Sequence, residues 1–382
     1  MKKTLIALAA LAATAGVAHA QSSVTLYGIA DAFVGVNQTQ VTGATAATTT
    51  PKLRQGVVNG SGLSSSRWGL RGTEDLGGGL AAVFTLESGF DISTGSLANN
   101  GGSNSSTASV LFGRQAWVGL KGTFGETRLG RQYTAYDSLR GVTNNTYDSN
   151  TFATTGAVWG TGVQDYSNRI NNAISYATPV FGGFSGSVVY GFGEDKTATT
   201  TTAGVTTPGH SASNSVSAQV RYANGPLLAG YAFQRERSAV GSTIFSGANT
   251  GVLSTVAVGS AAAADTRKYH LFAASYDLGV AKLVGSYNQA KSNTFKDKEY
   301  QVGVSVPFGA ASVAAGFTKS KSDSRTAAVN SNDGTGYSLL GTYDLSKRTT
   351  FYAGYINLKS ESANGATEAK RSLFGTGVRH TF

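Results

Sequence analysis

Apolar and polar side chains alternate with a period of two in many separate stretches of the chain. In residues 215–222, for example, valine, alanine and tyrosine occupy the even positions, whereas serine, glutamine and arginine occupy the odd ones. Because successive side chains of a strand point to opposite faces, such a stretch predicts a β-strand with one apolar and one polar face. Each stretch is about 10 residues long, the length of a tilted strand that crosses a bilayer. Further examples are residues 184–192 (where Val189 interrupts the polar face), 280–288, 298–306 and 373–382.

Turn-forming residues divide these stretches at regular intervals. Glycine and asparagine permit positive φ, and proline and aspartate favour the start of a turn. Seven short turns are predicted at residues 72–79, 121–126, 178–183, 223–226, 276–279, 307–309 and 343–347. Eight longer segments, rich in Thr, Ser, Asn and Gly, lie near residues 38–61, 92–108, 133–165, 194–213, 238–266, 291–297, 320–334 and 359–371. An up-and-down barrel of n strands whose termini lie on one side has n/2 long loops and n/2 − 1 short turns, so the eight segments and seven turns both predict sixteen strands.

The composition favours a barrel that lies in a membrane. Only 40% of the residues are hydrophobic, and after residue 20 no apolar run is long enough for a membrane helix. A sheet in hydrocarbon pairs all its backbone groups only if it closes on itself, with apolar faces outward and polar faces inward. With roughly sixteen strands the interior is too wide for side chains to fill, which predicts a water-filled channel. A soluble β-sandwich or barrel shows the same alternation and is the alternative fold.

The first twenty residues have the pattern of a secretory signal peptide. Lys2 and Lys3 precede an apolar stretch at residues 4–17, and the sequence Ala-His-Ala at 18–20 fits a cleavage site. We therefore expect residues 1–20 to be removed and residues 21–382 to form the barrel. Loss of the two lysines lowers the formal charge from +10 to +8. The chain has no cysteine, which excludes disulfides and thiol-ligated metal sites.

The mature chain resembles the trimeric general porins of Gram-negative bacteria, of the β-proteobacterial and neisserial type. The resemblance is carried by residues 22–28 (SSVTLYG), 66–80 (SRWGLRGTEDLGGGL), 118–125 (VGLKGTFG), 128–132 (RLGRQ), 174–179 (ISYATP), 345–349 (LSKRT) and 377–382 (GVRHTF). It implies an all-β, 16-stranded antiparallel transmembrane barrel, with long external loops and short periplasmic turns. It further implies a homotrimer in the outer membrane, passive diffusion of small hydrophilic solutes, and an inward-folded third loop. The terminal Phe382 would belong to the signal read by the outer-membrane assembly machinery.

The resemblance also suggests which arginines form a basic wall at the narrowest point of the pore: Arg67, Arg114 and Arg169. Strand parity places Arg67 on the inward face, and it places Arg169 with Ser175, opposite Ile170. Arg128 shares a polar face with Gln132 and is a fourth candidate. Arg114 has the parity of a lipid-facing row, so a β-bulge near Gly113 would be needed to turn it inward.

The third long segment would supply the other side of the constriction. Tyr136, Asp137 and Asp148 are the residues of this segment that we expect at the narrow point. Arginine rings are the usual device of anion pores, so we predict a mild anion preference that the two aspartates partly offset. Inorganic anions and small hydrophilic solutes are then the expected permeants, and outer-membrane lipid and lipopolysaccharide the expected surroundings.

Three other functions are open to a chain of this kind. An outer-membrane hydrolase would need catalytic groups, yet the sequence contains no G-x-S-x-G, H-E-x-x-H, P-loop or G-x-G-x-x-G motif, so we predict no enzyme, cofactor or metal. The pI near 9.6 would suit a nucleic-acid binder, but the basic residues are dispersed, and we predict no such partner. A soluble exported binding protein or adhesin is the third, and it would make no channels in a bilayer.

Overall fold

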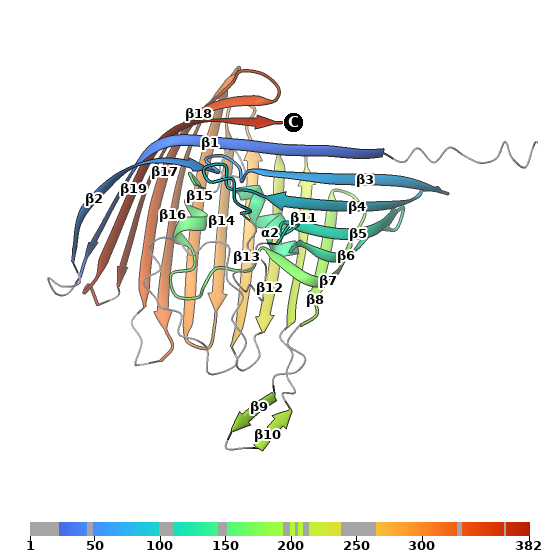
Figure 1. Cartoon of the computed structure of the whole chain (residues 1–382), viewed down its shortest axis with the longest axis horizontal. Coiled ribbons are helices and arrows are strands. Elements are labelled where there is room, and N and C mark those ends of the chain that lie inside the picture. Colours follow the sequence, from blue (N-terminus) through green and yellow to red (C-terminus); the bar gives the residue numbers. More distant parts are fainter. Residues whose placement is uncertain are drawn as a thin grey trace, which may run out of the picture.

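Seventeen strand segments, of which β2 and β3 together count as one strand, close into a single antiparallel barrel of sixteen strands, as predicted (Figure 1). The computed structural model describes residues 23–43, 49–98, 110–143, 151–193, 199–202, 205–208, 214–237, 265–326, 331–362 and 364–382, so the predicted signal peptide lies outside them. The strands of the wall are β1 (Ser23–Thr42), β2 (Thr50–Gly60), β3 (Arg67–Gly77), β4 (Leu80–Gly89), β5 (Gln115–Gly122), β6 (Gly125–Tyr133), β7 (Arg169–Ala177), β8 (Phe184–Gly191), β11 (Asn214–Asn224), β12 (Leu227–Arg237), β13 (Thr266–Asp277), β14 (Lys282–Lys291), β15 (Phe295–Phe308), β16 (Ala311–Ser324), β17 (Asn332–Asp344), β18 (Thr349–Ser362) and β19 (Glu368–Thr381). A separate hairpin of β9 (Thr199–Thr202) and β10 (Val205–Pro208) is not part of the wall.

Segments β2 and β3 together make the second strand of the barrel. Both pair with β1, β2 over residues 32–41 and β3 over residues 23–29. The Asp31 carboxylate fixes the break between them, because it accepts hydrogen bonds from the backbone N–H groups that follow β2 and from the Tyr352 hydroxyl on β18, at 2.5–3.0 Å. The predicted loop at residues 38–61 is therefore wrong at both ends, since β1 continues to Thr42 and β2 begins at Thr50.

The first and last strands meet and close the barrel. Strand β1 pairs with β19 in a continuous register from Ile29 opposite Thr381 to Thr42 opposite Glu368. The backbone of Phe382 adds a reciprocal pair with Gly28, with N–O distances of 3.0 and 3.1 Å. This leaves no free edge between the two ends of the sheet, as a barrel in hydrocarbon requires.

The seven predicted short turns all join neighbouring strands at one end of the barrel. The connections at the other end differ more from expectation, because the strands there run longer than about 10 residues. Strands β15 to β19 have 13–14 residues each, so they consume much of the segments predicted as loops near residues 291–297, 320–334 and 359–371. At about 3.4 Å per residue such strands extend beyond the hydrocarbon core.

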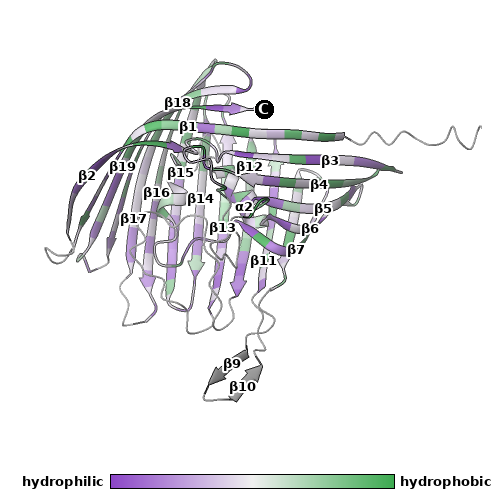
Figure 2. Cartoon of the chain, in the orientation of Figure 1, coloured by the Kyte–Doolittle hydropathy of each residue, from purple (hydrophilic) through white to green (hydrophobic). Residues whose placement is uncertain are grey.

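The alternation predicted from the sequence is visible along the strands as alternating bands of hydrophilic and hydrophobic residues (Figure 2). Large apolar side chains on the outer face are strongly exposed, including Val118, Leu129, Phe272, Val302 and Phe374, each at 55–58%. Many polar side chains at the alternate positions, such as Ser217, Gln234 and Glu299, are buried, because the connection between β6 and β7 covers them from inside. No helix among the described residues is both long and apolar enough to cross a membrane.

Two glycines of adjacent strands test how tightly the wall is built. A Cβ atom on Gly35 of β1 would lie 2.4 Å from the carbonyl oxygen of Phe374, whereas one on Gly56 of β2 would meet nothing within 4 Å. We expect Gly35→Val to destabilise the barrel by about 1–3 kcal/mol, because backbone atoms have to shift. Gly56→Val is the control and should have little effect. Both variants are incubated in increasing urea and run without heating on an SDS gel, where folded and unfolded barrels migrate differently. The urea concentration at which half of the protein is unfolded measures stability, and equal values for the two variants would contradict the prediction.

Candidate pore constriction

The third long connection, between β6 and β7, folds into the barrel as predicted (Figure 1). It contains α2 (Ala135–Arg140), a short 3-10 helix η2 (Gly141–Thr143) and α3 (Thr155–Val158). The Thr134 hydroxyl caps α2 by accepting from the Asp137 N–H at 3.1 Å. Helix α2 packs on β11, β12 and β13, and α3 packs on β16, β17 and β18. The loop therefore lies along the inner side of the wall from β11 to β18.

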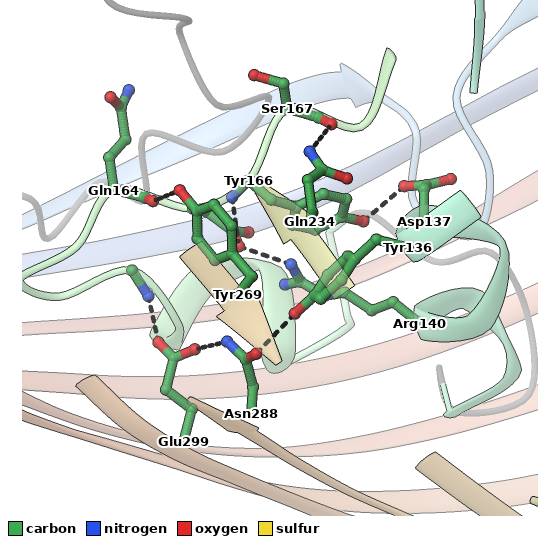
Figure 3. A network of polar contacts seen from close by, with 12 residues as sticks. Tyr136, Asp137, Arg140, Gln164, Tyr166, Ser167, Gln234, Tyr269, Asn288 and Glu299 are labelled. Carbon is green, nitrogen blue, oxygen red and sulfur yellow. Dashed lines mark hydrogen bonds and ion pairs between the residues drawn. The ribbon is translucent and has the colours of Figure 1, made fainter. Parts of the chain in front are cut away.

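A cluster of three buried tyrosines fastens the loop to the wall (Figure 3). The ring of Tyr136 lies 4.4 Å from that of Tyr166 and 6.0 Å from that of Tyr269 on β13. The Tyr136 hydroxyl donates to Asn288 of β14 at 2.8 Å, and the Tyr166 hydroxyl donates to Asp137 at 2.5 Å. Burial raises the pKa values of the Tyr136 and Tyr166 phenols well above their usual range, so both remain donors.

A buried ion pair holds the two halves of the loop together. The Arg140 guanidinium donates to the Asp165 carboxylate at 2.6 Å, and both side chains are about 5% exposed. The same guanidinium lies over the rings of Trp159 and Tyr166, at 4.9 and 4.7 Å from their centroids. Burial by itself would lower the pKa of Arg140, but the Coulomb attraction of Asp165 and Tyr166 and the hydrogen bond to Asp165 together raise it above its usual range. Such a pair fixes geometry, since removal of one partner leaves an uncompensated buried charge.

Carboxylates of the wall bind the backbone of the loop. Glu299 of β15 accepts from Gly160 N–H at 2.6 Å, and Asp297 accepts from Val163 N–H at 2.7 Å. Glu236 of β12 accepts from Ser167 N–H at 2.6 Å. These charge-assisted hydrogen bonds satisfy loop N–H groups that have no partner in a helix or sheet.

A chain of polar contacts on the inner wall joins β1, β4, β6 and β7. The Tyr27 hydroxyl on β1 donates to Glu87 of β4 at 3.0 Å, and Arg114 donates to the same carboxylate at 2.7 Å. The Tyr133 hydroxyl at the end of β6 accepts from both Arg114 and Arg169, each at 2.6 Å. The charge of Arg67 on β3 also acts on Glu87.

The structure thus brings Arg67, Arg114 and Arg169 to one part of the inner wall. Arg114 precedes β5 at a bend, and this bend, rather than a bulge within the strand, turns it toward Glu87. Arg128 lies apart, with its Nε donating to Glu126 at 2.5 Å and its guanidinium over Trp117. It is five positions from Tyr133 along β6, about 16 Å by the rise of a strand.

The start of β7 does not follow the predicted strand parity. Ile170, predicted to face lipid, is 3% exposed and packs with Ala173, Val189 and Ala135 of the loop. The pairing of β6 with β7 shifts between Gly130 and Gln132, and Asn172 has a φ of 47°, so the faces exchange at that point. Arg169 joins the cluster through Tyr133. The same packing explains why Val189 interrupts a polar face.

The predicted loop residues divide into two groups. Tyr136 and Asp137 lie in α2, inside the barrel, whereas Asp148 lies outside the described residues. Sequence reasoning missed Tyr133, Tyr166 and the wall carboxylates that bind the loop. The inward parity of Asp297 and Glu299 on a strand with outward valines was the available signal.

Comparison with known proteins agrees with this architecture. The family of Gram-negative porins matches residues 7–363. The chain belongs to this family. Outer membrane porin protein 32 of Delftia acidovorans and an outer membrane porin protein of Bordetella pertussis are each 34% identical over the full length of both chains. The solved anion-selective porin from Comamonas acidovorans has a TM-score of 0.70 at 28% identity, and the match covers 95% of this chain and 100% of that one.

The family assignment places this porin in the outer membrane of a Gram-negative cell and identifies it as a channel. The seven short turns are then periplasmic and the long connections external, as outer-membrane barrels require. The relatives are porins rather than enzymes, which agrees with the lack of catalytic motifs in the sequence.

The buried ion pair of the loop gives a direct test of its rigidity. We expect Asp165→Asn to leave Arg140 without its counter-ion and to loosen the loop, at a local cost of about 3–5 kcal/mol. Trypsin should then cleave after Arg140, which is 5% exposed in the wild type. Asp277→Asn in an exposed periplasmic turn is the control and should stay resistant. If D165N resists trypsin as the wild type does, the pair does not hold the loop.

Proposed function

We propose that this outer-membrane porin passes ions and small hydrophilic solutes by diffusion and that it prefers anions. The observation that carries the preference is the contact chain on the inner wall. Arg67, Arg114 and Arg169 bring three positive charges to the carboxylate of Glu87, so basic side chains outnumber acidic ones in this chain of contacts. Arg128 of the sequence-based set is not part of this excess, because it pairs with Glu126.

The size of the effect follows from Coulomb's law. A unit charge about 6 Å from a passing anion contributes about 3 kcal/mol at an effective dielectric near 20, and much less in bulk water. Counter-ions reduce this further at physiological salt. A local excess of positive charge in a narrow passage is thus enough for a several-fold preference. The solved relative described as an anion-selective porin supports the same sign.

Exchange of single charges tests the proposal in both directions. Arg169→Gln should lower the chloride-to-potassium permeability ratio several-fold, and Glu87→Gln should raise it, because they remove opposite charges from one cluster. Arg128→Gln is the control, with a smaller change. Reversal potentials of single channels in a salt gradient measure the ratio. A cation-preferring wild type, or shifts of the same sign for R169Q and E87Q, would overturn the assignment.

We further propose that three copies assemble into a homotrimer, as the family resemblance implies. Exposed apolar side chains on the outer face of β1 and β2, such as Val24, Leu26 and Val58 at 59–68%, are suited to contact with lipid or a neighbouring barrel. Sedimentation of the detergent-solubilised protein should give three times the mass of one chain, and a monomer would contradict this.

We also propose the export route and the membrane surroundings that the family resemblance implies. Residues 1–20 would direct export and be removed, and Phe382 would be read by the outer-membrane assembly machinery. The outer surface would lie in outer-membrane lipid and lipopolysaccharide.

A further inference from the structure

Four basic residues stand directly opposite one another on four adjacent strands. Arg235 of β12 pairs with Lys268 of β13, Lys268 pairs with Lys291 of β14, and Lys291 pairs with Lys296 of β15. All four have the parity of the outer face, because they share it with exposed residues such as Phe272. Like charges in directly opposite positions repel each other, so this row destabilises the sheet unless something neutralises it.

The row is part of a larger patch at the external end of the barrel. Two positions nearer the membrane, Lys298 of β15 pairs with Lys321 of β16, again on the outer face. We call these residues the basic belt: Arg235, Lys268, Lys291, Lys296, Lys298 and Lys321. The lysines of the belt are exposed or half-buried.

Among the described residues the belt meets fewer acidic than basic side chains. Asp323 lies opposite Lys296 and Asp333 opposite Lys321, and Asp265 accepts from the Asn293 N–H in the turn between β14 and β15. Three acids at the same end of these strands, Glu236, Asp297 and Glu299, point inward and bind the third loop. The sequence of residues 238–264, which connects β12 to β13, contains no Asp or Glu.

The belt lies at the height where lipid headgroups begin. Four positions further along the same strands, about 13 Å by strand rise, the outer face carries Tyr231, Phe272, Tyr287 and Tyr300. Aromatic rings of this kind mark the interface of a membrane. Beyond them, toward the periplasmic turns, the outer face of these strands is apolar, with Leu283, Val302 and Phe308 exposed at 45–62%.

A second lysine pair on the same barrel end is built differently. Lys359 of β18 stands opposite Lys370 of β19. Here Lys359 lies 3.0 Å from Glu361 and 2.8 Å from Glu368, and Lys370 lies 2.6 Å from Glu368. The protein neutralises this pair itself, whereas the described part of the chain shows no ion pair for the lysines of the belt.

We propose that the basic belt on β12 to β16 is a binding surface for phosphorylated lipid headgroups of the external leaflet. The proposal rests on the proposed function only in that the long-loop end must face the cell exterior. Lysine ammonium groups bind phosphate as point charges, and a row at strand spacing lets one phosphate contact two of them. The aromatic rings below would then pack against the acyl chains of the same lipid.

The two lysine pairs provide matched variants. K268Q/K291Q removes two opposed lysines from the belt, and K359Q/K370Q removes two from the self-neutralised pair. The ligand is diphosphoryl lipid A, compared with the same lipid lacking its phosphates, in a zwitterionic detergent. A Lys near an anionic surface contributes roughly fivefold in binding, so K268Q/K291Q should weaken the diphosphoryl form about thirtyfold and leave the phosphate-free form unchanged. K359Q/K370Q should change little.

Thermal unfolding adds a readout with opposite signs. Without lipid A, K268Q/K291Q should unfold at the wild-type temperature or above it, because repulsion is relieved, and K359Q/K370Q should unfold at or below it. Addition of diphosphoryl lipid A should raise the unfolding temperature of the wild type more than that of K268Q/K291Q. Single-channel conductance in phosphatidylcholine bilayers shows that each variant folds and conducts. If the wild-type protein itself formed no channels, this would contradict the proposed pore function but not the proposed lipid binding by the belt.

Several results would overturn the proposal. Equal binding of the two lipids by the wild type would show that phosphate is not recognised. Equal losses in both double variants would indicate a non-specific effect of net charge. Complete competition by an excess of inorganic phosphate would identify a site for free phosphate rather than for a lipid.

Discussion

The constraint on which the rest of this structure depends is that every backbone N–H and C=O group within hydrocarbon must be paired inside the protein. The continuous register between β1 and β19 meets it, since it joins the two ends of the sheet and leaves no open edge. Closure then decides the chemistry of each face. Outward positions meet lipid and inward positions meet water, so the same period of two that builds the strands also sorts the charges.

That sorting is visible in single stretches of sequence. In Lys296-Asp297-Lys298-Glu299 the bases point outward to the belt and the acids point inward to the third loop. Residues 235–237 repeat the pattern, with Glu236 inward between two arginines. One strand therefore serves two purposes at once, because it anchors the constriction loop on its inner face and presents cations at the membrane surface on its outer face.

The proposed constriction combines a loop held by buried contacts on one side with a cluster of three arginines and Glu87 on the other. The loop is held by buried tyrosines, the Arg140–Asp165 pair and wall carboxylates. Its position therefore does not depend on its two short helices, which have six and four residues. The opposite wall holds Arg114 and Arg169 through the shared hydroxyl of Tyr133. A fixed passage lined by fixed charges can bias ions without a binding site.

The sequence by itself determined the barrel, because strand faces, turns and the count of sixteen depend on local alternation and turn chemistry. It also placed Arg67, Tyr136 and Asp137 on elements that face the lumen. Only the tertiary structure decided where that alternation fails: a bend turns Arg114 inward, and the shift near Gly130 and Asn172 buries Ile170. The contacts of Tyr133 and Glu299 join residues far apart in the chain, and no local pattern encodes such distances.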